Sequence, residues 1–525
     1  RDFLGYQRDF GAAVANWLDG KFTTEESLDL SHVLLAVPAS SARRQLLQSL
    51  LLKAEQSGKP FLPPEIVTTG TLAESLYRPD KPFASEEVQL LVWTTLLQEF
   101  HDDGRLSTVV PQAPQSAPLS FWTDLASRLG RLHRELAGDQ ITFERVQRYC
   151  ARQGLESEAQ RWATLTELQS AYLERLNDHQ LWDKQTARLF AVEHHETPDS
   201  APTIVLAGTV DLTRTIRSLI AHVPDVYALV LADESDAAFF DETGSLSTEQ
   251  RFPAPVINQN QVTFSNNIDD ACVQMMRHIC TYDGNHDSND LLIALPNENH
   301  VPFVQSELER HSVSSFFPIA GTTHESTPYT LLQLAFDFTA NQSYSVLAQL
   351  VRHSDLQLRL EAEFGTAGFC AIFDNYFNQH LATELHSTYV SAEQYPQAHN
   401  VLSFLEEMIQ PIKDSTTVEQ ATTGIFHLLT VVYGSRQPRS LTNVELHALS
   451  TASSVVGNLT EAVQRLNLRL SVSDFLEAFM QKWGSGEASA PGVDGVDLRG
   501  WLEVPFHPAK AVLVFGANEG VLPRN

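Results

Sequence analysis

Runs of consecutive apolar residues occur at five places along the chain, and each ends in a proline, a glycine or an acidic residue. They are His32–Pro38, Thr203–Gly208, Tyr227–Asp233, Asp290–Pro296 and Ala511–Gly516. A parallel strand that helices cover on both faces reads as a continuous apolar run, whereas a strand with one wet face alternates. The runs therefore predict an α/β fold. We expect the first three strands to share one parallel sheet and the last two to share another.

Apolar residues at helical spacing fill most of the chain between these runs. Ser41–Ala54 follows the first run and has leucines at 46, 47, 50 and 51. Steps of three and four, which put side chains on one face of a helix, separate Trp162, Leu165, Leu168, Tyr172 and Leu176. Similar spacing marks two long helical blocks, 85–198 and 329–483. We expect linkers at Thr243–Gln261, which is polar, and at Gly484–Gly500, which is rich in glycine.

This order predicts two α/β cores, each interrupted by a helical insertion, which resembles the arrangement of superfamily 1 helicases. We expect the first RecA-like core (P-loop NTPase-like) at 1–84 and 199–260, with its insertion at 85–198. The second RecA-like core is expected at 261–328 and 484–525, with its insertion at 329–483.

The charge balance excludes one class of protein. The 525 residues include 65 Asp and Glu but only 36 Lys and Arg, which gives a net charge of −29. A protein that wraps nucleic acid has a basic domain, so this class is excluded, although a local basic groove is not.

Cysteine usage and hydropathy bear on location. The four cysteines, Cys150, Cys272, Cys280 and Cys370, form no CxxC pair, which argues against disulfides or a zinc ribbon and favours the cytoplasm. The apolar runs are too short to cross a membrane, and the N-terminal stretch lacks the features of a signal peptide. Because the sequence starts with Arg1, we expect it to be a piece of a longer chain.

A motor driven by ATP needs the phosphate loop GxxxxGK[ST], and the sequence has none. The nearest fragment, Ser57-Gly58-Lys59, is interpreted as a surface turn. Asp233 and Glu234 follow an apolar run as in a Walker B strand, but without a phosphate loop they are interpreted as solvated residues. His194-His195-Glu196 lacks metal-site spacing and is interpreted as a loop.

Two helical faces are basic. Arg43 and Arg44 lie near the start of the helix after the first strand, where free N–H groups also favour a phosphate. Arg128, Arg131 and Arg134 recur at steps of three on a second helix. Either face could contact a phosphate backbone, and either could be a solvated face paired with acidic neighbours.

Three passages resemble the helicase-like region of bacterial PD-(D/E)XK nuclease family proteins akin to the B subunit of the AddAB-type helicase–nuclease. They are FLGY before HVLLAVPASSARRQLLQSLL, then PPEIVTTGTLAESLY, and finally GWLEVPFHPAKAVLVFGANEGVLPRN. The most specific element is the closing G-x-x-E-G-x-x-P, Gly516–Pro523, which matches the turn after motif V in superfamily 1 helicases.

The resemblance implies which residues contact DNA. Pro38–Arg44 corresponds to helicase motif Ia, Thr69-Gly70-Thr71-Leu72 resembles a second stretch along the DNA, and Gly500–Glu503 resembles motif V with one residue inserted. Phe3–Tyr6 stands where the phosphate loop of the family would be. The candidate DNA-binding residues are Ser40, Ser41, Arg43, Arg44, Thr69, Thr71 and Glu503.

The resemblance implies a helicase-like module without ATPase activity, part of an exonuclease for DNA end processing and recombination repair. Such a module would guide single-stranded or end-frayed DNA to a downstream nuclease domain, which would use Mg²⁺ and lie beyond residue 525, and would bind a partner superfamily 1 helicase. No cofactor is expected within the present residues. Two alternatives remain: a scaffold that docks a partner and never contacts DNA, and an active superfamily 1 ATPase with a divergent nucleotide site.

Overall fold

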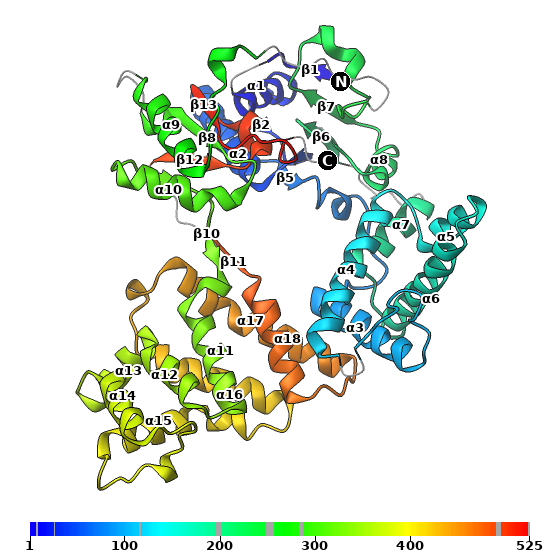
Figure 1. Ribbon diagram of the computed structural model, residues 1–525. Coiled ribbons are helices and arrows are strands. Elements are labelled where there is room, and N and C mark those ends of the chain that lie inside the picture. Colours follow the sequence, from blue (N-terminus) through cyan, green and yellow to red (C-terminus); the bar gives the residue numbers. More distant parts are fainter. Residues whose placement is uncertain are drawn as a thin grey trace.

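The computed structural model describes residues 1–6, 9–25, 27–114, 117–194, 202–209, 211–247, 257–282, 287–489 and 495–522. Two parallel sheets lie next to each other in the upper part of the view in Figure 1, and two helical regions extend below them. The predicted α/β class is thus confirmed. No helix in these ranges is long and apolar enough to span a bilayer.

The first sheet has five strands in the order β1-β7-β6-β3-β5, and all neighbouring strands in it are parallel. Its strands are β1 (Asp2–Phe3), β3 (Val33–Val37), β5 (Glu65–Thr68), β6 (Thr203–Ala207) and β7 (Val226–Val230). The runs at 32–38, 203–208 and 227–233 therefore share one sheet, as predicted. A long helical stretch of chain separates β5 from β6.

Helices cover both faces of this sheet, which explains the continuous apolar runs. Leu35 and Val37 of β3 pack with α1 (Phe10–Phe22) and α2 (Ser40–Ser57), whereas Leu34 and Ala36 pack against α7 (Lys184–His194) and α8 (Arg214–Ile220). Every residue of β3 is buried as a result. A pair of short strands, β2 (Leu28–Asp29) and β4 (Phe61–Leu62), lies beside this core.

The second sheet has the order β13-β8-β12-β9 and is also parallel. Its strands are β8 (Leu291–Ala294), β9 (Ser315–Phe316), β12 (Val496–Arg499) and β13 (Ala511–Val514), and α9 (Ile268–Cys280) and α10 (Val301–Arg310) pack against it. The runs at 290–296 and 511–516 share this sheet, as predicted.

Two expectations about the second core are wrong. β13 is an edge strand in which Val512 is 43% and Val514 53% exposed, so helices do not cover it on both faces. The expected linker Gly484–Gly500 contains β11 (Glu487–Ser489) and the central strand β12, because the glycines of this segment flank the largely buried residues Val496–Arg499 and do not interrupt them. β11 pairs with β10 (Ile319–Thr322) where the chain leaves for the second helical block. Of the other expected linker, residues 248–256 lie outside the described residues.

Two long stretches of the described chain are almost entirely helical. The first comprises α3 (Glu86–Asp102), α4 (Leu119–Gly138), α5 (Phe143–Arg152), α6 (Glu156–Asp178) and α7. The second comprises α11 (Thr327–Ala340), α12 (Tyr344–Arg352), α13 (Ser354–Phe364), α14 (Phe369–His380), α15 (Pro396–Lys413), α16 (Val418–Tyr433), α17 (Asn443–Arg465) and α18 (Val472–Gly484). One cluster of buried apolar side chains extends through both blocks, so the blocks touch each other (Figure 1).

Candidate nucleic-acid interface between the two sheets

The helix that follows β3 begins without an internal cap. Ala39 occupies the N-cap position in extended conformation, and among the described residues no side chain caps the first turn of α2. The unpaired N–H groups and the helix dipole make such an end favourable for an anion. Ser40, Arg43 and Arg44 are exposed on the first two turns, and Ser41 belongs to the same first turn.

The two candidate threonines lie at the same edge of the sheet. Strand β5 pairs with β3, and the backbone N–H of Thr69 donates to the carbonyl of Val37 at 3.0 Å. The hydroxyl of Thr71 is exposed and donates to the carbonyl of Thr68 at 3.2 Å. Six of the seven candidate residues therefore gather where β3 and β5 end, next to the point where the strand order reverses between β3 and β6.

The seventh candidate, Glu503, faces this edge from the second core. It lies in the 3-10 helix η9 (Trp501–Phe506) and lines an open pocket of about 330 Å³ together with Ala39, the N-cap of α2. The pocket also includes Trp501, which is 50% exposed, and Phe317. An exposed indole beside a helix N-terminus can stack on a nucleic-acid base while the helix contacts its phosphate.

Sequence reasoning missed two residues of the second core that lie next to this pocket in the chain, Phe316 and Arg499. Arg499 is only 3% exposed, and its Nε and Nη1 atoms have no hydrogen-bond partner among the described residues. Its guanidinium lies 5.2 Å from the ring centre of Phe316, and Arg44 of the first core lies 6.0 Å from the same ring. Phe316 therefore contacts a cation from each core, a favourable arrangement for an aromatic face.

Asp497 provides the charge that compensates buried Arg499. Its carboxylate accepts a hydrogen bond from His507 Nε2 at 2.6 Å and lies 3.4 Å from Arg499 Nη2, and Glu503 lies 4.0 Å from Arg499 Nη1. Burial alone would raise the pKa of Asp497, but the His507 hydrogen bond and the charge of Arg499 outweigh burial and hold it below its usual value. Only the alternation Val-Asp-Leu-Arg at 496–499 could have indicated this strand.

At the other end of the same sheet edge, the N-terminus of α1, the helix after β1, is capped and covered by side chains. The Asp9 carboxylate accepts a hydrogen bond from the N–H of Ala12 at 2.8 Å and so caps α1 itself. Phe10 is fully buried beneath Phe506, with 5.2 Å between the ring centres. Both rings lie over Gly208, which has φ +63°; a Cβ atom there would stand 2.8 Å from Phe10 Cε1. Side chains therefore fill the space at the N-terminus of α1.

Acidic residues follow β7 at the same edge of the sheet. Asp233 and Glu234 are exposed, in agreement with their interpretation as solvated residues. The hydroxyl of Tyr6 donates to Asp236 at 2.7 Å, which raises the pKa of Tyr6 to about 12 because a second negative charge there would be repelled.

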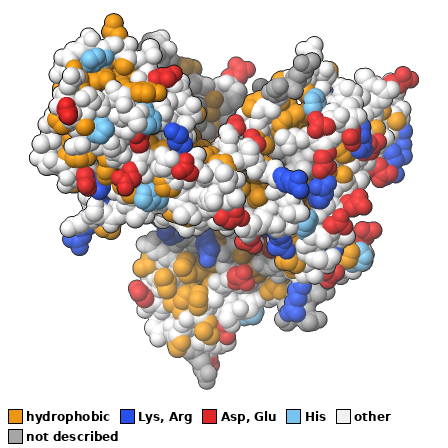
Figure 2. Space-filling view, turned by 90° about the horizontal axis from the view of Figure 1, so that it is seen from below, with side chains coloured by type: hydrophobic (Ala, Val, Ile, Leu, Met, Phe, Trp, Pro, Cys, Tyr) orange, Lys and Arg blue, Asp and Glu red, His pale blue; other side chains and the backbone are white. Residues whose placement is uncertain are grey.

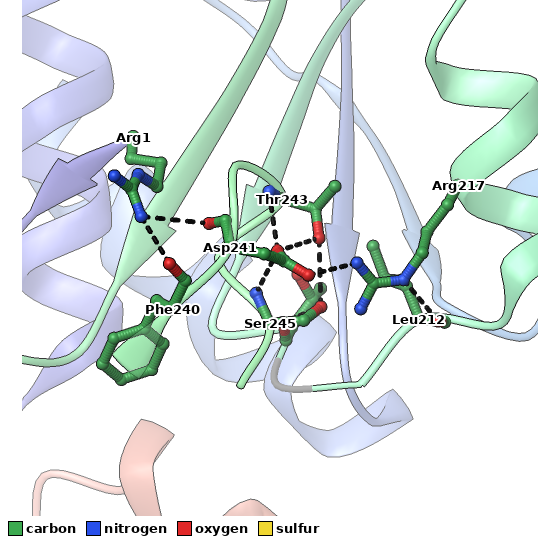
Figure 3. Close-up of polar contacts among 8 residues, drawn as sticks. Arg1, Leu212, Arg217, Phe240, Asp241, Thr243 and Ser245 are labelled. Carbon is green, nitrogen blue, oxygen red and sulfur yellow. Dashed lines mark hydrogen bonds and ion pairs between the residues drawn. The ribbon is translucent and has the colours of Figure 1, made fainter. Parts of the chain in front are cut away.

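Asp241 stabilises the turn that follows, as Figure 3 shows. It accepts hydrogen bonds from the N–H of Thr243 at 2.9 Å and of Ser245 at 3.1 Å, and it pairs with Arg217. Burial alone would raise the pKa of Asp241, but these hydrogen bonds and the charge of Arg217 outweigh burial and lower the pKa below its usual value. The carboxylate therefore stays charged. Its role here is structural, and no group of three His, Cys, Asp or Glu side chains that could hold a metal occurs within the described ranges.

The remaining motifs have local explanations. Gly58 ends α2 with φ +65° and Lys59 donates to the carbonyl of Thr24 at 2.6 Å, which confirms a turn. In the closing motif, Gly516 and Gly520 have φ of +75° and +81°, and Pro523 lies outside the described residues. His194 ends α7, and His195 and Glu196 lie outside the described residues.

The sequence matches no model of a known protein family, and no curated protein matches it.

Proposed function

We propose that this chain is a helicase-like DNA-guiding module with no ATPase activity, built on two RecA-like cores. It holds a single strand or a frayed end in the pocket between the cores and passes it to a PD-(D/E)XK nuclease domain, whose Mg²⁺ would carry out hydrolysis. The observation that carries the proposal is the contrast on one sheet edge. The N-terminus of α2 has no side-chain cap and is followed by exposed arginines. The N-terminus of α1 is capped by a carboxylate and covered by Phe10 and Phe506.

The net charge of the protein supports contact with DNA at one small site and not along an extended surface. The net charge of −29 repels DNA over most of the surface, so binding confined to a small basic site is expected to depend steeply on salt. Figure 2 shows basic side chains in small groups between acidic ones on the face seen from below. Such a module belongs in the cytoplasm, beside a partner helicase that supplies the motor.

The test is single-strand binding by the double variant Arg43→Glu, Arg44→Glu. We expect affinity for an oligo-dT strand at low salt to fall roughly ten-fold or more, because two charge-assisted contacts contribute about 1–3 kcal/mol. The control is Arg148→Glu, Arg152→Glu on α5, which makes the same charge change at two exposed positions in the first helical block. Equal binding by parent and R43E/R44E, or no binding by the parent, would contradict DNA guidance.

Docking of a protein partner is the second candidate function, and the edge strand β13 favours it. Val512 and Val514 are half-exposed on that strand, and its outer backbone edge pairs with no described strand. If the parent binds no DNA, a scaffold role becomes the better proposal.

A further inference from the structure

A second basic pocket lies where the two helical blocks meet. It has a volume of about 390 Å³ and is formed by α3 and α4 of the first block and α18 of the second. Three cations line it, Arg131, Arg134 and Lys482, against one carboxylate, Glu86. The balance at this pocket is therefore positive in a protein that is strongly acidic as a whole.

The arginines on α4 differ from others in the same block. Arg105, Arg161 and Arg175 each pair with a glutamate at 2.7–3.0 Å. Arg131 and Arg134 are exposed, and in the described part of the chain they form no ion pair or hydrogen bond; the same holds for Arg128, one turn earlier. Since carboxylates outnumber cations in this chain, an unpaired row on one helix face leaves charge available for a ligand.

The walls of the pocket are fixed before any ligand arrives. Gln481 of α18 accepts a hydrogen bond from Thr123 at 2.9 Å and donates to Asp124 at 2.8 Å, so it joins the two blocks. Lys482 pairs with Glu86 at 2.7 Å across the same junction, and the Lys482 hydrogen bond lowers the pKa of Glu86, with Arg134 and Lys184 adding to the effect. Lys482 thus closes the junction, while Arg131 and Arg134 stay unpaired.

The lining favours phosphate groups over bases or a protein segment. Ser127, Ser485 and Gln89 add neutral hydrogen-bond donors beside the cations. The one aromatic lining residue, Trp93, is buried and stacks on Tyr172 at 4.1 Å, so it cannot stack on a base. A docked protein segment gains its affinity from buried aromatic or apolar anchors, and this pocket presents no exposed large apolar side chain for one.

We propose that this pocket is a second binding site for the phosphate backbone of the DNA strand, with Arg131 and Arg134 as its contacts. This inference rests on the proposed DNA-guiding function and extends the path of the strand from the cleft between the sheets to the junction of the helical blocks. Backbone contacts position a strand without reading its sequence, which suits a guide.

The test compares Arg131→Glu, Arg134→Glu with the control R148E/R152E in fluorescence anisotropy with dT8 and dT40 probes. A strand that engages both sites gains avidity, whereas a short one occupies one site at a time. We expect R131E/R134E to weaken dT40 binding roughly ten-fold and to reduce the slope of log K against log salt by about 1.4, the value for two single-strand phosphates. Protection of Arg131 and Arg134 from phenylglyoxal by dT40 in the unmodified protein gives a readout that needs no folded variant.

The outcomes separate the two proposals. If R43E/R44E weakens dT40 binding while R131E/R134E behaves like the control and neither arginine is protected, the pocket inference is wrong and DNA guidance stands. If the parent binds neither probe, DNA guidance itself is wrong. Loss of poly-glutamate binding in R131E/R134E with unchanged dT40 binding would assign the pocket to an acidic protein instead.

Discussion

Two helices begin at the carboxyl edge of the same parallel sheet, yet their N-termini have opposite character. At α1 the Asp9 carboxylate satisfies the helix end, and Phe10 lies beneath Phe506. At α2 the N-cap is Ala39, and exposed Arg43 and Arg44 follow. A negative charge at one end and positive charges at the other mean that an anion is excluded from the first and attracted to the second.

This difference shows that two helix N-termini at one sheet edge can have opposite electrostatic character, depending on the residues that cap and cover them. One segment of the second core, η9, contacts the N-termini of both helices. Its Phe506 covers the N-terminus of α1, and its Trp501 and Glu503 line the pocket beside the N-terminus of α2. The cores are therefore joined by buried packing.

The largest expected effect is the loss of stability when Phe506, which covers the N-terminus of α1, is truncated. Phe506 is 1% exposed and belongs to the apolar cluster of the first core, so Phe506→Ala should cost about 3–5 kcal/mol through lost burial and a cavity. Urea denaturation monitored by tryptophan fluorescence measures this. Trp501→Ala, at a half-exposed position five residues earlier, is the control and should change stability little while weakening oligo-dT binding. Equal stability of F506A and the parent would show that the cores are not joined here.

Exchanging the caps sharpens the comparison. Asp9→Ala should destabilise the protein by about 1 kcal/mol, because it removes the cap of α1. Ala39→Asp should stabilise it by a similar amount, because Ala39 has the extended conformation of an N-cap residue, and should weaken single-strand binding. Thermal unfolding and filter binding measure the two effects. Calorimetric titration with ATP should show no binding to D9A, since Phe10 still fills the position; stronger DNA binding by A39D would contradict the role of this helix end.

The sheets could be predicted from the sequence wherever burial was complete. β3, β6 and β7 appear as continuous apolar runs because helices cover both faces of the first sheet. The run that forms β13 looks the same, yet it became an edge strand, since the pattern records apolar residues and not the helices that cover them. β1 and β9 have only two residues each and carry no readable period.

The candidate site was predictable only where its residues are neighbours in sequence. Arg43 and Arg44 follow one strand directly, so their place at the sheet edge could be inferred from the chain alone. Phe316 contacts Arg44, and Trp501 lines the pocket with Ala39, because the second core packs against the first; no local pattern encodes that packing. The junction of the helical blocks is likewise a result of tertiary contact between distant segments.

The smallest expected effect is a change in how the free energy of unfolding depends on pH, caused by the contact of Asp497 with His507 just after η9. His507 and Arg499 hold the pKa of Asp497 below its usual value, so in the folded protein the charged form is favoured. Stability from this group is therefore fully present above the ordinary Asp pKa of about 4 and is lost as the pH falls through the lower folded value. Between about pH 5 and pH 3 the free energy of unfolding should fall less steeply in Asp497→Asn than in the parent. Urea midpoints at several pH values measure the two slopes, and Asp80→Asn, at an exposed bend of the first core, is the control. Parallel slopes for D497N and the parent would show that the His507–Asp497 contact does not anchor the segment.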